Sequence, residues 1–178
     1  VTKFSGVTEL NLAAGGAAAA GSITVNSGTT LNIDADIGDQ AYTVTVGGAG
    51  TTDTLTLDLA TNVDFLGTTG TSDTFTGIET LTIAGSTTGT HIFTDGLIMT
   101  QTAATQKVVI TGAAAVTLSV QSTLDQLDGS AATGVITTTG GFANAVTVTG
   151  GSAADVLNGS TAGDIITGGE GADVINGL

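Results

Sequence analysis

The last part of the chain repeats a nine-residue pattern three times without a gap. Residues 150–176 read GGSAADVLN, GSTAGDIIT and GGEGADVIN, and each frame begins with glycine. The sixth position is always aspartate and the eighth is always a large aliphatic residue (Asp155, Asp164 and Asp173; Leu157, Ile166 and Ile175). A fixed short period indicates stacked structural units, because each unit can bury its apolar residue only against its neighbours.

The nine-residue pattern resembles the repeat G-G-x-G-x-D-x-U-x, which is typical of the calcium-binding parallel β-rolls of RTX proteins. The third frame matches it fully, whereas the first has Ala153 at the fourth position and the second has Ser160 and Ala162 at the second and fourth. A strand with the inward aliphatic residue would run into a six-residue turn, where glycine reaches positive φ and leaves carbonyls accessible. Calcium takes about six to eight oxygen ligands, so we expect two stacked turns to share one ion.

The roll architecture predicts which turns share that ion. Two nonapeptides form one coil, so turns eighteen residues apart stack and Asp155 faces Asp173. Asp164 lies on the opposite edge, where its upstream counterpart is Val146, so a complete site there needs residues beyond Leu178. The resemblance to RTX rolls implies this ligand set for one ion: the carbonyls of Gly150 and Ser152 with Asp155, and the carbonyls of Gly169 and Gly171 with Asp173.

A looser version of the glycine–aspartate spacing occurs upstream. GGAGTTDTL (47–55) and GTTGTSDTF (67–75) each have two glycines three residues apart and an aspartate three residues further on. The extra residue before Asp53 and Asp73 departs from the nonapeptide, so these two are weaker calcium candidates. For every site the alternative is a metal-free series of turns, because glycine and aspartate are ordinary turn residues.

Alternating apolar and polar residues dominate the rest of the chain and predict half-buried strands. The runs are TELNLA (8–13), YTVTV (42–46), DTLTLDL (53–59), ETLTIA (79–84), KVVIT (107–111), VTLSV (116–120) and AVTVT (145–149). FSGVTELNLA (4–13) and FTGIETLTIA (75–84) also align position by position, which favours stacked turns. We therefore predict an all-β, solenoid-like stack that ends in a calcium-binding parallel β-roll, with an ordinary β-sandwich as the alternative.

The expected organisation is a Thr/Ala/Gly-rich β region over residues 1–140, with degenerate repeats, followed by the roll over residues 141–178. The Ala/Gly-rich residues 13–21 are predicted to form a loop, because their glycines disfavour a helix. The chain has no initiator methionine, and we expect it to be a fragment of a longer secreted protein. No apolar run approaches the roughly 20 residues of a membrane-spanning helix.

The charge balance limits the possible partners. Among 178 residues there are 2 basic and 16 acidic ones, which gives a formal net charge of −14. Nucleic acid and anionic membranes bind positive surfaces, so neither is expected as a partner, whereas hard divalent cations are. Hydrophobic residues make up 40% of the chain, which is enough for a packed core rather than disorder.

The sequence offers no recognisable catalytic group. It contains no cysteine, and no catalytic motif surrounds its single histidine, His91. We therefore expect a protein that is not an enzyme, and we interpret His91 as a structural residue of a strand.

Three stretches together are similar to the RTX-type surface-layer (S-layer) proteins of Gram-negative bacteria: GTSDTFTGIETLTIAG (70–85), STLDQLDGSAATG (122–134) and the nonapeptides. The resemblance implies type I secretion without a cleaved signal, folding that depends on Ca²⁺ outside the cell, and a cell-surface location. It also implies that the chain's main partner is itself, in a two-dimensional lattice over the outer membrane. Lipopolysaccharide would be bound through a segment outside this sequence.

Two other functions fit the same sequence features. The chain could be a segment of an RTX adhesin that binds glycans, although one Tyr and five Phe leave little for an aromatic-lined groove. It could also be the roll of a secreted RTX enzyme or toxin, whose catalytic domain would precede residue 1.

Overall fold

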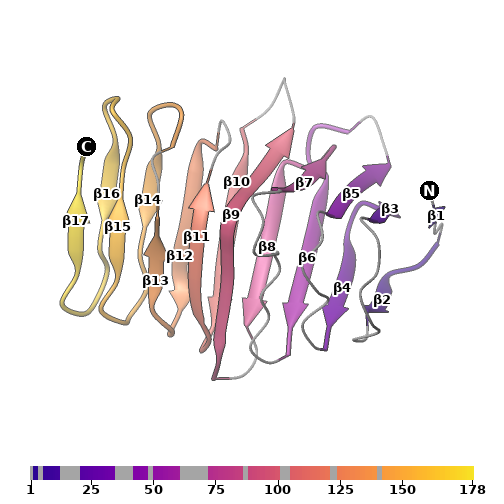
Figure 1. Cartoon of the computed structure of the whole chain (residues 1–178), viewed down its shortest axis with the longest axis horizontal. Coiled ribbons are helices and arrows are strands. Elements are labelled where there is room, and N and C mark those ends of the chain that lie inside the picture. Colours follow the sequence, from indigo (N-terminus) through magenta and orange to yellow (C-terminus); the bar gives the residue numbers. More distant parts are fainter. Residues whose placement is uncertain are drawn as a thin grey trace.

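The chain folds as a β-solenoid, in which parallel strands stack along one long axis (Figure 1). The computed structural model describes residues 2–3, 6–12, 21–34, 42–47, 50–60, 72–85, 88–100, 105–120, 124–139 and 142–178. Consecutive strands alternate between two sheets, so each coil contributes one strand to each sheet. The N and C termini lie at opposite ends of the stack in Figure 1.

The two sheets contain all the strands of the described residues. Sheet A has nine strands, in this order: β1 (Thr2–Lys3), β3 (Gly21–Asn26), β5 (Tyr42–Gly47), β7 (Asp73–Thr76), β9 (Thr90–Thr100), β11 (Ala115–Val120), β13 (Ile136–Thr138), β15 (Val156–Asn158) and β17 (Val174–Asn176). Sheet B has eight: β2 (Glu9–Leu12), β4 (Thr29–Ile33), β6 (Thr54–Leu59), β8 (Thr80–Gly85), β10 (Lys107–Gly112), β12 (Gln126–Ala132), β14 (Thr147–Thr149) and β16 (Ile165–Thr167).

Rows of aliphatic side chains fill the space between the sheets. Alternate residues of each strand point inward, as the burial pattern of β6 and β8 shows. Because neighbouring strands are parallel and in register, like residues stack from coil to coil. One such row in sheet B consists of Leu55, Leu81, Val108, Leu127, Val148 and Ile166. Two of the few aromatic residues, Phe75 and Phe93, are fully buried in this core.

Coil length varies along the chain and is shortest at the C-terminal end. Thr54 pairs with Thr80, 26 residues later, and Thr80 pairs with Lys107, 27 residues later. In the nonapeptide region Thr147 pairs with Ile165, and the separation is 18 residues. The longer coils lack a uniform period, whereas the last coils consist of two nonapeptides each.

Glycines form the corners of several coils. Gly6 and Gly77 occupy equivalent positions of the two aligned decapeptides, and their φ angles are 75° and 76°. At this left-handed conformation an L side chain is strained, so both copies of the repeat use glycine to enter a strand of sheet B. The internal repeat is therefore a repeated turn as well as a repeated strand.

The predicted all-β solenoid is confirmed. Every paired strand is parallel to its neighbours, which excludes the antiparallel sandwich considered as the alternative. The alternation between sheets continues from β13 to β14, across the boundary expected at residues 140 and 141. The loop predicted at residues 13–21 lies outside the described residues except for Gly21, which begins β3. No described helix is long and apolar enough to cross a membrane.

Candidate metal site

Asp155 and Asp173 occupy the same position of successive coils. Each immediately precedes a strand of sheet A, and these strands pair with Val156 opposite Val174. The backbone N–H of Asp155 donates a 2.9 Å hydrogen bond to Oδ1 of Asp173. The two turns expected to share an ion are therefore stacked in the register that two nonapeptides per coil require.

The carboxylate of Asp155 closes its own turn and also joins that turn to the preceding coil. Its Oδ2 accepts a 2.7 Å hydrogen bond from the N–H of Gly151, and its Oδ1 accepts one of 2.7 Å from the N–H of Ile136. The residue is completely buried. Asp155 thus stabilises the turn without any ion, because a buried backbone N–H needs an acceptor. A carboxylate oxygen has two lone pairs, so the second one remains for a cation.

The glycines of the stacked turns permit a close approach of the two coils. A Cβ on Gly169 would overlap the carbonyl oxygen of Gly151, and a Cβ on Gly171 would overlap that of Ala153. Both residues also have positive φ, 99° and 114°. The frame that matches the pattern fully therefore has glycine where backbone atoms of the preceding turn leave no room for a side chain.

Carbonyls of the stacked turns differ in their bonding, and those of Ala153 and Glu170, like the four expected ligands, accept no hydrogen bond from the described residues. The carbonyl of Gly151 accepts the N–H of Glu170, and that of Ala132 accepts the N–H of Ser152. The carbonyls of the expected ligands accept no hydrogen bond from the residues that the structure describes (Gly150, Ser152, Gly169 and Gly171). Hard oxygen atoms without hydrogen bonds, beside two stacked carboxylates, fit the preferences of calcium.

Asp164 lies on the other edge of the solenoid, before β16, as expected. Its Oδ1 accepts a 2.9 Å hydrogen bond from the N–H of Val146, one coil upstream, and its Oδ2 accepts one of 2.7 Å from the N–H of Ser160. These donors, first Ser160 and then Val146, hold the pKa of the Asp164 carboxyl below its usual value. Asp164 repeats the arrangement of Asp155, but Val146 supplies no carboxylate to its turn.

The two weaker candidates do not come together. Asp53 precedes β6 in sheet B, whereas Asp73 begins β7 in sheet A and is fully buried. The N–H of Asp53 donates a 2.6 Å hydrogen bond to Oε2 of Glu79, one coil downstream. The shared local spacing of these two aspartates does not place them on one edge. By sequence, Asp34, Asp36 and Asp39 are a further candidate cation site, although a solvated acidic stretch is the favoured interpretation; Asp34 is exposed directly after β4, and Asp36 and Asp39 lie outside the described residues.

A ladder of carboxylates is the feature that sequence reasoning missed. Glu79 and Asp125 each precede a strand of sheet B, and each accepts the backbone N–H of the residue one coil upstream, Asp53 and Gln106 respectively. Asp155, Asp164 and Asp173 also precede strands, of sheet A or sheet B, and each accepts a backbone N–H from one coil upstream. In the sequence an acidic residue directly precedes the alternating run in IETLTI (78–83) and LDQLDG (124–129), but this position alone does not indicate the hydrogen bond.

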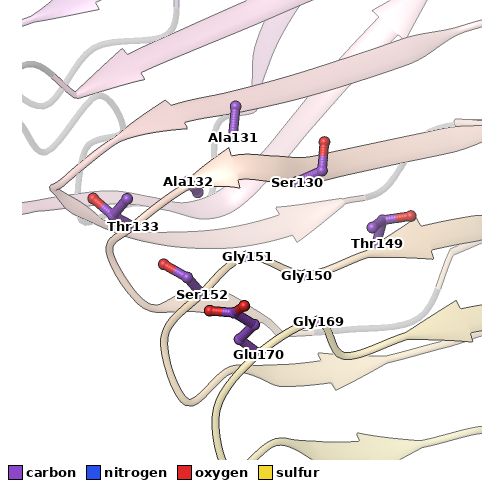
Figure 2. A pocket seen from close by; sticks show the side chains of 10 residues that line it. All are labelled: Ser130, Ala131, Ala132, Thr133, Thr149, Gly150, Gly151, Ser152, Gly169 and Glu170. Carbon is purple, nitrogen blue, oxygen red and sulfur yellow. The ribbon is translucent and has the colours of Figure 1, made fainter.

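An open groove of about 450 Å³ runs across three stacked turns on the side of sheet B (Figure 2). Ser130, Thr133 and Ser152 contribute hydroxyls, and Glu170 contributes the one charged side chain of the lining. Gly150 and Gly169, two of the expected ligands, also line it. Its lining has no aromatic ring, which a glycan-binding groove would use as a stacking platform.

Lys107 and Asp128 form an ion pair on sheet B. Nζ of Lys107 lies 2.7 Å from Oδ2 of Asp128. This contact and the hydroxyl and N–H of Ser130 lower the pKa of Asp128 to about 2. His91 is buried near the start of β9, and burial lowers its pKa. Nowhere in the described residues do three or more His, Cys, Asp or Glu side chains form a metal cluster. A roll site does not require one, because most of its ligands are carbonyls.

Comparison with known proteins gives no match. No protein-family model, no curated protein and no solved structure is similar to this chain at a significant level. The functional interpretation therefore depends on the geometry of the stacked turns and on the sequence.

Proposed function

We propose that the chain belongs to a structural, self-assembling protein of the bacterial cell surface. Calcium ions lie between the stacked turns of residues 150–176, and copies of the protein assemble into an S-layer lattice outside a Gram-negative cell. The observation that carries the proposal is the stacking of Asp155 on Asp173 beside carbonyls that accept no hydrogen bond.

The ion has a stabilising role in this proposal. Two carboxylates one coil apart repel each other, and ordering a glycine-rich turn costs conformational entropy. A cation bound by both turns offsets the repulsion and binds the folded state alone. At a hundredfold excess over Kd, such binding adds about 2.7 kcal/mol per site to the free energy of unfolding.

Calcium also explains when assembly takes place. Copies with a net charge of −14 repel each other, and a Debye length of about 10 Å at 0.1 M salt screens this repulsion only in part. Extracellular calcium modules commonly have Kd values of about 10⁻⁴–10⁻³ M. The roll would therefore fold, and assembly begin, only after export from the low-calcium cytoplasm.

The decisive experiment is electron microscopy of the full-length protein titrated with calcium, with magnesium or with EDTA. We expect ordered arrays at millimolar calcium and none in EDTA. Magnesium is the matched control, because its rigid octahedral coordination at shorter distances suits the stacked turns less. Arrays that form equally well in EDTA, or a protein that stays monomeric at every calcium concentration, would contradict the proposal and favour the adhesin segment.

A further inference from the structure

The outer face of sheet A carries ladders of threonine. Inward residues of β5, β7 and β9 are buried, for example Val44, Phe75 and Met99, and the threonines that alternate with them point outward. Strand register places Thr24, Thr45, Thr76 and Thr100 in one row across four strands. Thr43 stands opposite Thr74 in the neighbouring row. The Oγ1 of Thr100 donates a 2.9 Å hydrogen bond to Oγ1 of Thr76, so a hydroxyl contact joins the last two threonines of the row.

The side chains that the structure describes on this face are uncharged, although the chain is acidic. Of the outward side chains that the structure describes on the sheet A strands β3 to β17, none is charged; Asp73, the charged residue described there, is buried. Towards the C terminus a separate outward row, in register with Ile92 of β9, consists of Thr117, Thr137, Val156 and Val174. Sheet B differs, because its strands carry Glu9, Asp58, Lys107 and Asp128 on the outside.

We infer that the outer face of sheet A packs against the same face of a second copy of the chain. This inference rests on the proposed self-assembly and names the surface through which it takes place. Like-charged copies can approach at lowest cost where neither presents a charge. Threonine suits a self-complementary contact, because its hydroxyl both donates and accepts hydrogen bonds and its methyl group packs against another methyl group.

The dimensions of the face predict a weak contact. Nine strands about 4.8 Å apart extend for about 40 Å, and the three to six residues of every strand except β1 (2 residues) and β9 (11 residues) give a width of about 10–20 Å. The buried area is then about 400–800 Å² per copy, at or below the roughly 800 Å² per partner of a standard stable complex. We therefore expect association that depends on protein concentration and becomes strong only when many copies cooperate.

Two pairs of substitutions on full-length protein test the contact. Thr45→Asp with Thr76→Asp places two charges on the outer face of sheet A. Thr56→Asp with Thr82→Asp is the matched control, because these threonines are neighbours in register on the outer face of sheet B. Sedimentation equilibrium in calcium should show association about tenfold or more weaker for the sheet A pair and unchanged for the sheet B pair.

Cross-linking provides a second measurement, which does not require the contact to bury an introduced carboxylate. The natural sequence has no cysteine, so Thr45→Cys and Thr56→Cys each introduce a single thiol. A bifunctional thiol reagent that spans two facing sheets, about 10 Å, should join copies carrying Thr45→Cys and leave those carrying Thr56→Cys as monomers.

The outcomes separate this contact from the proposed function. If wild-type arrays form with calcium and both aspartate pairs assemble like wild type, the contact lies elsewhere and the inference is wrong, whereas the S-layer proposal stands. If no arrays form at any calcium concentration, the S-layer proposal fails. Cross-linking then still decides, because equal cross-linking through both thiols, or through neither, overturns the sheet A contact.

Discussion

The backbone N–H of Asp155 donates its hydrogen bond to a carboxylate oxygen of Asp173, eighteen residues further along the chain. The Asp173 side chain thus accepts the backbone N–H of Asp155, and the Asp155 side chain in turn accepts the backbone N–H of Ile136. A carboxylate in this position stabilises the junction between two coils even when no ion is bound. Calcium would add to this hydrogen bonding and would not replace it, because each oxygen has a second lone pair.

Removing calcium should open the last coils. In EDTA we expect the amide protons of Ile136, Gly151 and Asp155 to exchange up to about a hundredfold faster, which corresponds to about 2.7 kcal/mol per site. Hydrogen exchange of the full-length protein with and without calcium measures this change. Amides of β6 and β8 serve as the internal reference. Equal protection in EDTA would support metal-free turns of glycine and aspartate.

The two edges of the roll should respond differently to loss of a carboxylate. Asp173→Asn should weaken calcium binding by residues 1–178 more than Asp164→Asn does, because Asp173 stacks on Asp155 whereas Asp164 stacks on Val146. Calorimetric titration of both variants with calcium gives the comparison. Equal losses would show that the ion does not lie between turns eighteen residues apart.

Alanine should be tolerated at one glycine of the nonapeptides and not at another. Gly169→Ala introduces a Cβ that overlaps the Gly151 carbonyl at a φ of 99°, so we expect a loss of about 1–3 kcal/mol in the free energy of unfolding. At Gly163 a Cβ would have no atom within 4 Å, and φ is not positive, so Gly163→Ala should change stability by less than about 0.5 kcal/mol. Urea denaturation monitored by circular dichroism compares the two variants.

Lys107 should control the titration of Asp128. Lys107→Met should raise the pKa of Asp128 from about 2 towards the unperturbed value of about 3.9. Because the folded-state pKa is the lower one, the pair stabilises the fold above about pH 4, and this contribution is lost as the pH falls towards 2. Both side chains are about one-third exposed (32% and 33%), so the contribution at neutral pH is only about 0.2–1 kcal/mol.

Carbon-detected NMR of the aspartate carboxyl groups measures that titration. Asp164 is the internal control, because its low pKa depends on the N–H groups of Ser160 and Val146 and not on Lys107. An unchanged Asp128 titration in the Lys107→Met variant would mean that Ser130 alone lowers its pKa.

The sequence was most informative where the repeat was strict. Three gapless frames predicted the eighteen-residue register that pairs Val156 with Val174, and alternation predicted the strands around Leu57 and Ile83. It was least informative in the longer coils. Their register depends on which aliphatic residues pack in the core, and a local spacing such as that shared by Asp53 and Asp73 defines a turn without defining its edge.

The role of the acidic residues before the strands was also beyond sequence reasoning. An aspartate or glutamate next to a turn is ordinary, and its position gives no sign of whether the side chain faces solvent or a backbone N–H one coil away. Only the strand pairing shows that Glu79 and Asp125 accept the backbone N–H groups of Asp53 and Gln106. Tertiary register, which no window of neighbouring residues contains, supplies that information.

The alternation of strands between two parallel sheets also defines how the molecule carries mechanical load. A force along the long axis loads the junctions between coils in series, so the stack separates first at its weakest junction. In sheet A, β13 and β15 share a single register pair, Thr137 with Val156. The bonds from Ile136 to the Asp155 carboxylate and between Thr138 and Asn158 reinforce that junction. Where β13 meets β15, side-chain hydrogen bonds therefore supplement a strand pairing of one residue pair, whereas β14–β16 and β15–β17 pair over three.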